Sequence, residues 1–556
     1  MAKKLLNNST IEPDEIFLDS SNLPEFDRNQ FEGRLEKPIQ LRSIIFIGTF
    51  FLIVLISFVT RLCYLQIVHG DTNNQKAENN RLRQTPVFAE RGLIYDRNHT
   101  LLAWNVPNEE DNNFSLRKYV DLLGLSHILG YVKYPTKDSS GFYYREQLGG
   151  VDGVEGFYDS DLAGTNGLRI VETNAAGNIQ SSSIIDLPVN GKNLTLSIDA
   201  SLQNELYRQI GDLAAKVGFT GGAGVIMDVH TGEILAMTSY PEFSSQIMTD
   251  GDNSKAINAY NKDTNHPFLD KVVSGLYTPG SIVKPYMALA ALQEKIIDPA
   301  KQIMSTGSIT IPNPYYPELS SVFRDWKPLG LMDMRHALAM SSDIYFYTVG
   351  GGFGDQKGLG INAIDSYLKL FGFGGDVGNG FFNDKVGTIP TPQWKAANFD
   401  GEAWRLGDTY HTAIGQYGFQ VTPIQVVRAV AAVANKGSLL EPTIFVGQPV
   451  QKTAVPIDQK NFDVVQQGMR LGVTDGISVA LNVPYVDVAN KTGTAELGVS
   501  KALVNSWATG FFPYENPRFA YAVIMEKGSR DNLTGSIFVM RGLLDWMSQN
   551  TPQYLK

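Results

Sequence analysis

Cysteine is nearly absent from this chain, because Cys63 is the only one in 556 residues. A single cysteine can form neither an intrachain disulfide nor a cysteine metal site. The seven histidines are scattered, and no two of them stand four residues apart, the spacing of a zinc-binding helix. The sequence therefore predicts no metal ion and no other cofactor.

Blocks of positive charge are absent as well. The chain has 47 lysines and arginines against 57 acidic residues, a net charge of −10. Proteins that bind nucleic acid normally carry a basic patch, so nucleic acid is excluded as a partner. The hydrophobic content of 43% and charged content of 19% are globular values. A chain of 556 residues is too long for one ordinary domain, so we expect two or three folded units.

Long apolar runs are rare, but one stands near the N-terminus. Residues 43–60 carry no charge, and at about 1.5 Å per residue they span roughly 27 Å, close to the thickness of a bilayer core. We expect a transmembrane helix over residues 43–68. A buried core helix is the alternative, and the uninterrupted uncharged run counts against it. A cleaved signal peptide is disfavoured because a polar tail of 42 residues precedes the run and no small-residue cleavage site follows it.

Flanking charge predicts the orientation of this helix. Four basic residues lie within fifteen positions before the uncharged run 43–60, and Arg61 is the only one within fifteen positions after that run. Positive charge stays on the cytoplasmic side. Residues 1–42, which lack hydrophobic periodicity, are thus expected to be a disordered cytoplasmic tail, with everything after Val68 outside.

Two regions follow the apolar run. Residues 69–215 contain short alternating segments and turns rich in Gly and Asp, and they end in a strand and a helix for which Asp199 is a plausible N-cap. The sequence pattern changes at residue 221. From there, two apolar runs flank a turn at residues 228–232, which predicts a hairpin. Helical and strand patterns then alternate through the second region, 216–550.

Three motifs stand in a fixed order in the second region: Ser281-Ile-Val-Lys284, Ser341-Ser342-Asp343 and Lys491-Thr492-Gly493-Thr494. Pro285 cannot sit inside a helix, so Ser281 must lie at the very start of the apolar helix that follows. The positive end of the helix dipole there favours developing negative charge. Lys284 falls on the same face and can reach the Ser281 hydroxyl.

These residue types suit acyl transfer by a serine whose proton is handled by lysine. A serine hydroxyl is a poor nucleophile until a base takes its proton. Lysine can do so only while it is neutral, which burial or a neighbouring cation favours. Lys491 could be that cation and could also hold a substrate carboxylate. The Lys491–Thr494 segment suits an edge strand in which Gly493 lets a substrate backbone approach closely.

The motifs are specific only as an ordered set. Ser-x-x-Lys alone is weak evidence, and Ser115-Leu-Arg-Lys118 is a second copy. That copy lacks the preceding turn, the apolar helix and the downstream partners, so we interpret it as a solvated surface segment.

With these motifs the chain resembles the class B penicillin-binding proteins, the D,D-transpeptidases that cross-link bacterial peptidoglycan. The likeness covers nearly everything after residue 60. It includes 91–98, 149–158, 232–237, 414–416 and 491–496. The resemblance implies a multi-domain α+β fold. It would comprise a single transmembrane helix, a β-rich pedestal over 69–215 with a shortened head, and a β-lactamase-like transpeptidase domain over 216–550 with a central antiparallel sheet flanked by helices.

The resemblance also implies roles for the motif residues. Ser281 would be the acylated nucleophile and Lys284 its general base, and Ser341 would relay protons to the leaving amine. Lys491 and Thr492 would hold the terminal carboxylate of the substrate, and the backbone N–H groups of Ser281 and Thr494 would form the oxyanion hole. Gly493 belongs to the substrate-binding strand, and Asp343 completes the catalytic set.

Substrates, partners and location follow from the same resemblance. The donor would be a stem peptide ending in D-Ala-D-Ala on strands derived from lipid II, and β-lactam antibiotics would acylate Ser281. A SEDS-family glycosyltransferase of the RodA kind would be the partner in the membrane. The chain is expected in the bacterial cell membrane as a single-pass protein, with most of its mass periplasmic or extracellular.

One departure from the family pattern concerns Asp343, where Asn is common. A carboxylate near Lys284 would favour the charged lysine and weaken it as a base, unless the carboxylate is protonated or turned away. Aspartate at this position resembles the elongation-type branch, penicillin-binding protein 2. The alternatives are a division-type transpeptidase, a protein that senses or hydrolyses β-lactams, and a catalytically inactive scaffold.

Overall fold

The computed structural model describes residues 41–73, 82–139, 143–173, 179–313, 316, 318–378, 380–382 and 384–556. The expected cytoplasmic tail, 1–42, lies outside the described residues except for its last two positions. Two compact units are present, one formed by 1–83 with 172–181 and the other by 84–171 with 182–556.

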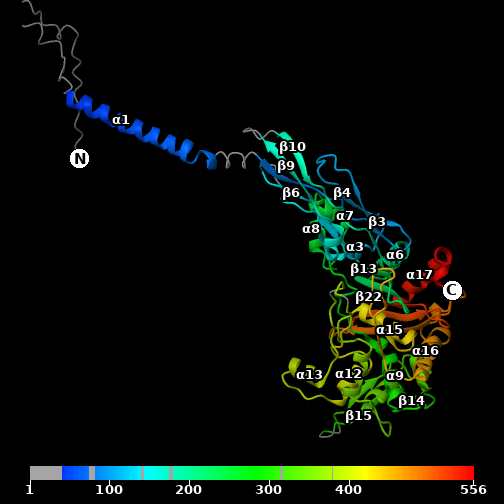
Figure 1. Ribbon diagram of the computed structural model, residues 1–556. Coiled ribbons are helices and arrows are strands. Elements are labelled where there is room, and N and C mark those ends of the chain that lie inside the picture. The colour runs from blue at the N-terminus through cyan, green and yellow to red at the C-terminus, as the bar shows by residue number, and fades with distance from the viewer. Residues whose placement is uncertain are drawn as a thin grey trace, which may run out of the picture. The chain divides into compact units, whose positions relative to one another are not determined.

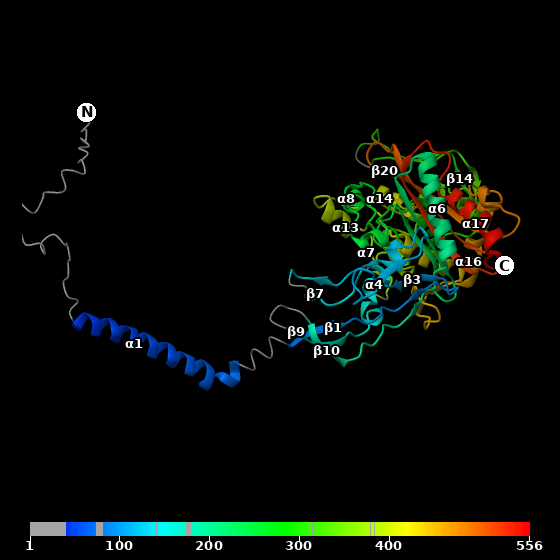
Figure 2. The same ribbon diagram turned by 90° about the horizontal axis from the view of Figure 1, so that it is seen from above.

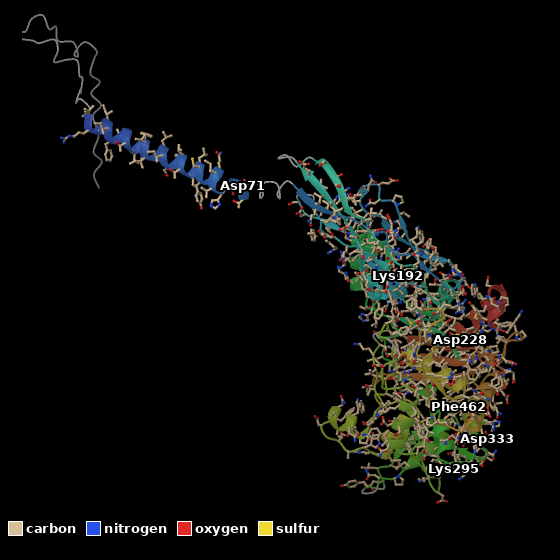
Figure 3. All side chains as sticks on the ribbon, in the orientation of Figure 1. Asp71, Lys192, Asp228, Lys295, Asp333 and Phe462 are labelled. Atoms are coloured by element: carbon tan, nitrogen blue, oxygen red, sulfur yellow. The ribbon has the colours of Figure 1, made fainter. Side chains whose placement is uncertain are left out.

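The apolar run of the first unit is a helix. It consists of the α-helix α1 (Leu41–Cys63) and a π-helical continuation, η4 (Tyr64–Val68). None of its side chains is buried, and in Figure 3 those of α1 project freely on all sides. A core helix is excluded by this exposure. Leu41–Val68 is long and apolar enough to cross a bilayer and is consistent with a single-pass membrane anchor.

The chain from residue 82 to residue 195 is rich in short strands. One sheet has the order β11-β2-β3-β4, and β1-β9-β10, β5-β8 and β6-β7 form three smaller sheets. The strands are β1 (Leu82–Val87), β2 (Ile94–Tyr95), β3 (Leu101–Val106), β4 (Leu116–Tyr119), β5 (Tyr131–Lys133), β6 (Thr136–Lys137), β7 (Tyr143–Arg145), β8 (Gly149–Val151), β9 (Gly167–Thr173), β10 (Ile179–Asp186) and β11 (Leu194–Thr195). Three short helices accompany them: α3 (Ser126–Leu129), α4 (Gly153–Phe157) and α5 (Asp159–Leu162).

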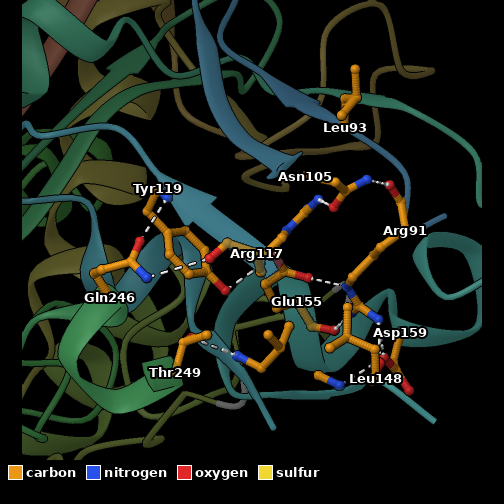
Figure 4. Close-up of polar contacts among 12 residues, drawn as sticks. Arg91, Leu93, Asn105, Arg117, Tyr119, Leu148, Glu155, Asp159, Gln246 and Thr249 are labelled. Carbon is orange, nitrogen blue, oxygen red and sulfur yellow. Dashed lines mark hydrogen bonds and ion pairs between the residues drawn. The ribbon is translucent and has the colours of Figure 1, made fainter. Parts of the chain in front are cut away.

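A buried ion network holds these strands to α4 and α5 (Figure 4). The Glu155 carboxylate accepts from Arg91 Nε at 2.5 Å and from Arg117 Nε at 2.7 Å, and Arg91 also pairs with Asp159 at 2.8 Å. The side chains of Glu155 and Arg117 are fully buried. Charges this deep are tolerated only when they are paired and hydrogen-bonded, so the network has a structural role.

The C-terminal part is built on a five-stranded antiparallel sheet with the order β13-β12-β22-β21-β20. Its strands are β12 (Gly221–Asp228), β13 (Ile234–Tyr240), β20 (Ala489–Leu497), β21 (Leu503–Phe512) and β22 (Phe519–Ser529). The predicted hairpin is thus the β12–β13 pair. β22, from the end of the chain, lies between β12 and β21, which leaves β20 at the edge of the sheet.

Side chains along the central strands point alternately to the two faces of the sheet. Each face is apolar and packs against its own hydrophobic core. In β22, Phe519, Tyr521 and Val523 face one core, whereas Ala520 and Ala522 face the other. Helices α6 (Ala200–Val217) and α17 (Ser536–Asn550) lie side by side on the first face (Figure 2). Helices α15 (Pro423–Ala434) and α16 (Gln459–Thr474) pack on the second face, and Figure 1 shows α15 beside β22. Asp199 caps α6, as predicted, by accepting from the backbone N–H groups of Ser201 and Leu202.

This part also contains further helices and short strands, which are not confined to one face of the sheet. The helical segments are α7 (Ser245–Asp250), α8 (Ser254–Lys262), η5 (Gly280–Val283), α9 (Lys284–Gln293), α10 (Met334–Ala339), α11 (Asp343–Gly351), α12 (Ile361–Leu370), α13 (Pro392–Asn398), α14 (Leu406–Ala413), η6 (Val479–Leu481) and η7 (Pro552–Tyr554). The short strands are β14 (Ile303–Ser305), β15 (Ser308–Ile311), β16 (Ser321–Arg324), β17 (Gly330–Met332), β18 (Ser438–Leu440) and β19 (Lys452–Ala454). The architecture is mixed α+β with a central antiparallel sheet, which confirms the fold class predicted from the sequence.

Candidate active site

Ser281 lies in a tight turn that precedes the buried helix α9. The turn is the 3-10 segment η5, and Lys284 is the first residue of α9, which places Pro285 in the first helical turn, where its missing N–H is tolerated. All residues of α9 from Lys284 to Leu292 are buried. The sequence predicted Ser281 at the start of the helix, and the structure places it one 3-10 turn earlier.

The turn is fixed from both sides by distant parts of the chain. Gly280 has φ +58° and donates its N–H to Gly415 O at 2.9 Å, and Gly415 in turn approaches so closely that a Cβ on it would lie 2.1 Å from Gly280 O. The indole Nε1–H of the buried Trp507, on β21, donates to Thr278 O at 3.1 Å. These contacts hold the turn rigidly against the central sheet. Within the part of the chain that the structure describes, the Ser281 hydroxyl makes no hydrogen bond.

Lys284 is fully buried, and its Nζ contacts the second motif. It donates to Ser341 O at 2.7 Å and to Ser341 Oγ at 3.3 Å, and it forms an ion pair with Asp343 Oδ1 at 2.6 Å. The Asp343 carboxylate is thus turned toward the lysine. Of the two possibilities left open by the sequence, the structure has the one in which this carboxylate pairs with Lys284.

Ser341 adopts a backbone conformation that usually belongs to glycine. Its φ is +57°, and it follows the last turn of α10, a helix that begins at the Asp333 cap labelled in Figure 3. Ser341 N–H donates to Leu338 O, and Ser342 N–H donates to Ala337 O. This pair of bonds is a Schellman motif with Ser341 at the left-handed position. A side chain there costs free energy, but it places the Ser341 hydroxyl between the two lysines.

Lys491 reaches the same hydroxyl from the edge strand β20. Its Nζ donates to Ser341 Oγ at 2.8 Å and to Thr492 O at 2.8 Å, and the residue is 1% exposed. Burial lowers the pKa of Lys491 well below its ordinary value, and the nearby charge of Lys284 lowers it further. Lys491 is therefore the one of the two lysines that favours the neutral amine.

Gly493 allows β20 to lie directly on the Ser281 turn. A Cβ on Gly493 would approach Pro279 O to 2.8 Å and Ile282 Cγ2 to 2.9 Å. Thr492 is half-buried and Thr494 is exposed, and together with Gly493 they line a cavity of about 460 Å³ at the edge of the sheet. The lining of this cavity does not include Ser281, Lys284 or Ser341, whereas β20 itself contacts the serine turn through Gly493.

The structure brings Lys284, Ser341, Asp343 and Lys491 into one hydrogen-bonded cluster. Ser281 lies one turn before Lys284. Sequence reasoning missed Trp507 as a clamp on the serine turn, and it missed Asp325 and Trp326, which hold the Ser341 segment. No local pattern marks these residues. Among the described residues, no group of three His, Cys, Asp or Glu side chains could hold a metal ion.

Comparison with known proteins gives two family matches. The model of the penicillin-binding protein transpeptidase domain matches residues 222–538, and that of the penicillin-binding protein dimerisation domain matches residues 113–196. The peptidoglycan D,D-transpeptidase MrdA of Acinetobacter baumannii is 29% identical over 89% of this chain and 86% of that protein.

Solved structures of similar fold include two proteins described as PBP2. The Pseudomonas aeruginosa protein in complex with WCK 5153 matches with a TM-score of 0.69 and 28% identity, over 85% of this chain and 98% of that one. The Helicobacter pylori protein in complex with MreC matches with a TM-score of 0.68, over 84% of this chain and 99% of that one. At 24% identity, the latter likeness concerns the fold alone.

Proposed function

Because the chain belongs to the penicillin-binding protein transpeptidase family, we propose that it is an elongation-type peptidoglycan D,D-transpeptidase that works through an acyl-enzyme on Ser281. The observation that carries this function is the placement of Ser281 in a rigid turn, with a buried lysine one turn on and an open strand edge beside it. The proposal includes the two-part organisation of the family, in which residues 69–215 form the pedestal and residues 216–550 form the transpeptidase domain.

Acylation forms one bond and breaks one. Ser281 Oγ attacks the carbonyl carbon of the penultimate D-Ala of a stem peptide, and the amide bond to the terminal D-Ala breaks. Backbone N–H groups of Ser281 and Thr494 stabilise the oxyanion. The proton of Ser281 goes to Lys284, and the leaving amine takes a proton from Ser341, which regains one from a lysine. In the second half, an amine of a neighbouring stem peptide attacks the ester and frees Ser281.

Lys284 must lose a proton before it can act as the base. In the free enzyme it faces Asp343, whereas Lys491 favours the neutral amine, and the Ser341 hydroxyl stands 3.3 Å from one Nζ and 2.8 Å from the other. A proton can therefore pass from Lys284 through Ser341 to Lys491. A substrate carboxylate held by Lys491 and Thr492 would stabilise the resulting ammonium, so that binding of the correct substrate generates the base.

Labelled penicillin tests this function and separates it from its alternatives. We expect the parent chain to form a stable covalent adduct and the Ser281→Ala variant to form none, because the Ser281 hydroxyl is the atom that carries the acyl group in the proposed mechanism. Rapid hydrolysis of the label would identify a β-lactam-hydrolysing protein instead. An unlabelled parent would indicate an inactive scaffold.

We further propose that α1 and η4 anchor the chain in the cell membrane with the N-terminus in the cytoplasm. The charge asymmetry around residues 43–60 supports this orientation. Reporter fusions that are active only outside the cytoplasm should work at the C-terminus and fail at the N-terminus. The opposite pattern would refute the orientation.

The proposed partner in the membrane is a SEDS-family glycosyltransferase of the RodA kind, which would polymerise the strands that this enzyme cross-links. Depletion should round the cells, and the enzyme should localise to the lateral wall. Septal localisation with filamentous cells would show the division-type alternative.

A further inference from the structure

Two consecutive residues, Asp325 and Trp326, hold the chain on both sides of Ser341. On the N-terminal side, the indole Nε1–H of Trp326 donates to Met340 O at 3.2 Å. On the C-terminal side, Asp325 Oδ2 accepts from the Ser342 hydroxyl at 2.8 Å. The residue with the strained backbone is therefore bracketed by two anchored neighbours.

The carboxylate of Asp325 also reaches further into α11. The same Oδ2 atom accepts from Ile344 N–H at 3.2 Å and from the Ser305 hydroxyl at 3.1 Å. Asp325 is only 9% exposed, and no ion pair reaches it within the described residues. A buried carboxylate without a cation is costly unless donors surround it, so these hydrogen bonds are strong and hard to replace.

The two residues are themselves anchored to the sheet framework next to the site. Asp325 N–H donates to Gly307 O at 2.9 Å, and Arg324 ends strand β16, where it pairs with Ser308 of β15. The segment is thus a fixed support, and it transmits the geometry of the β15–β16 sheet to the loop at Ser341.

We propose that Asp325 and Trp326 form a clamp that positions the Ser341 hydroxyl between Lys284 and Lys491 and thereby sets the rate of acylation. The proposal rests on the transpeptidase function given above. Both are positioning residues, because the contacts that carry this role run to the chain around Ser341 and not to either lysine. A left-handed serine needs such support, since without it the loop can relax and carry the hydroxyl out of hydrogen-bond reach. A displacement of about 1 Å is enough to lower a rate by up to about a hundredfold.

Two variants remove one arm of the clamp each. Trp326→Phe keeps the ring and deletes only the N–H donor, and Asp325→Asn keeps the shape but replaces one acceptor oxygen by an amide. The matched control is Trp404→Phe, which deletes an indole bond of the same kind, Nε1–H to Thr409 Oγ1 at 2.8 Å, that does not involve the Ser341 segment. The assay is acylation of the full chain in detergent by labelled penicillin, analysed for the limiting rate and the half-saturating concentration.

Each clamp variant should lower the limiting rate about tenfold or more, with less than about a threefold change in half-saturation, because geometry at the proton relay is lost and binding is not. The control should stay within about twofold of the parent. In a Ser341→Ala background, the loss caused by Trp326→Phe should shrink to less than about threefold, since there is no hydroxyl left to position. Melting temperatures of all variants are measured in parallel to check that they fold. If Asp325→Asn does not fold, the result for Trp326→Phe alone tests the proposal.

An unchanged limiting rate in Trp326→Phe, or an undiminished loss in the Ser341→Ala background, would overturn the clamp. Failure of the parent itself to form the adduct would instead overturn the transpeptidase function. The two failures are therefore distinguishable.

Discussion

At the scale of single residues, the site puts a serine where helix chemistry prefers glycine. Ser341 occupies the left-handed position of a Schellman motif with φ +57°. Its hydroxyl lies within hydrogen-bond distance of Lys284 and Lys491, which no glycine could provide. In the proposed mechanism, local stability is given up here for proton transfer, a common compromise at active sites.

Substitution of Ser341 should separate stability from activity. Ser341→Gly and Ser341→Ala both lose the hydroxyl, but only glycine relieves the backbone strain. We expect the glycine variant to unfold at a free energy about 1 kcal/mol higher than the alanine variant. Both should acylate far more slowly than the parent. Thermal unfolding and labelled-penicillin kinetics measure the two effects, and equal stability of the two variants would contradict the strain.

The sequence predicted which residues lie together in the site, but not how all of their side chains are oriented and held. The three motifs predicted Lys284, Ser341, Asp343 and Lys491 as neighbours, and the structure places them in one cluster. The direction in which Asp343 points was not predictable, because it depends on how α11 starts relative to α9. The bonds of Asp325 depend on a segment sixteen residues upstream of Ser341, with no pattern that marks it.

At the scale of elements, the site depends on how closely β20 approaches the serine turn. Gly493 is the residue that permits this contact, since any Cβ would meet backbone at Pro279. The sequence predicted the strand and the need for glycine, because alternation and a missing side chain are local signals. It did not predict that β22 would lie between β12 and β21, since strand order is decided by pairing across nearly 300 residues.

Gly493→Ala should therefore push β20 away from the turn. We expect a loss of about 1–3 kcal/mol in unfolding free energy and a clear drop in the acylation rate. Gly149→Ala is the matched control, because that glycine has no atom within 4 Å of an added Cβ and lies in β8, away from the site. A Gly493→Ala variant that acylates at the parental rate would show that the close approach is dispensable.

The predicted boundary at residue 215 is not tested by these contacts and stays a prediction. Helix α6 crosses this boundary near its C-terminal end, and it packs against β12, β13 and α17 of the central-sheet region. A boundary predicted from a change in sequence pattern cannot show which region such a helix packs against. The hydrophobic pattern of a helix at a domain junction is the same whichever domain it covers.

At the scale of the whole molecule, the strand-rich N-terminal part meets the central-sheet region through a titratable group. Glu242 follows strand β13, and its carboxylate accepts backbone N–H bonds from Gly124 at 2.5 Å and from Ser126 at 3.0 Å. Burial raises the pKa of Glu242 to about 7, although these two bonds act in the opposite direction. The contact is thus sensitive to pH near neutrality.

The sign of this sensitivity follows from proton binding. Because the folded pKa is about 7 and the ordinary value is 4.5, the folded protein binds more protons than the unfolded chain between those values. Stability from this group is fully present below about pH 4.5 and is lost as the pH rises through about 7. Melting temperatures should therefore fall across this window by more in the parent than in Glu242→Gln. The exposed Glu109→Gln is the control, and identical pH profiles for parent and Glu242→Gln would contradict the assignment.

The outermost position of β20 has a consequence for the catalytic cycle. A donor peptide that hydrogen-bonds along this strand becomes a temporary sixth strand of the sheet, and the sheet loses it again when the cross-linked product departs. Product departure must then break several backbone hydrogen bonds at once. The strand pairing that aligns a substrate therefore also limits how quickly the enzyme can bind the next substrate.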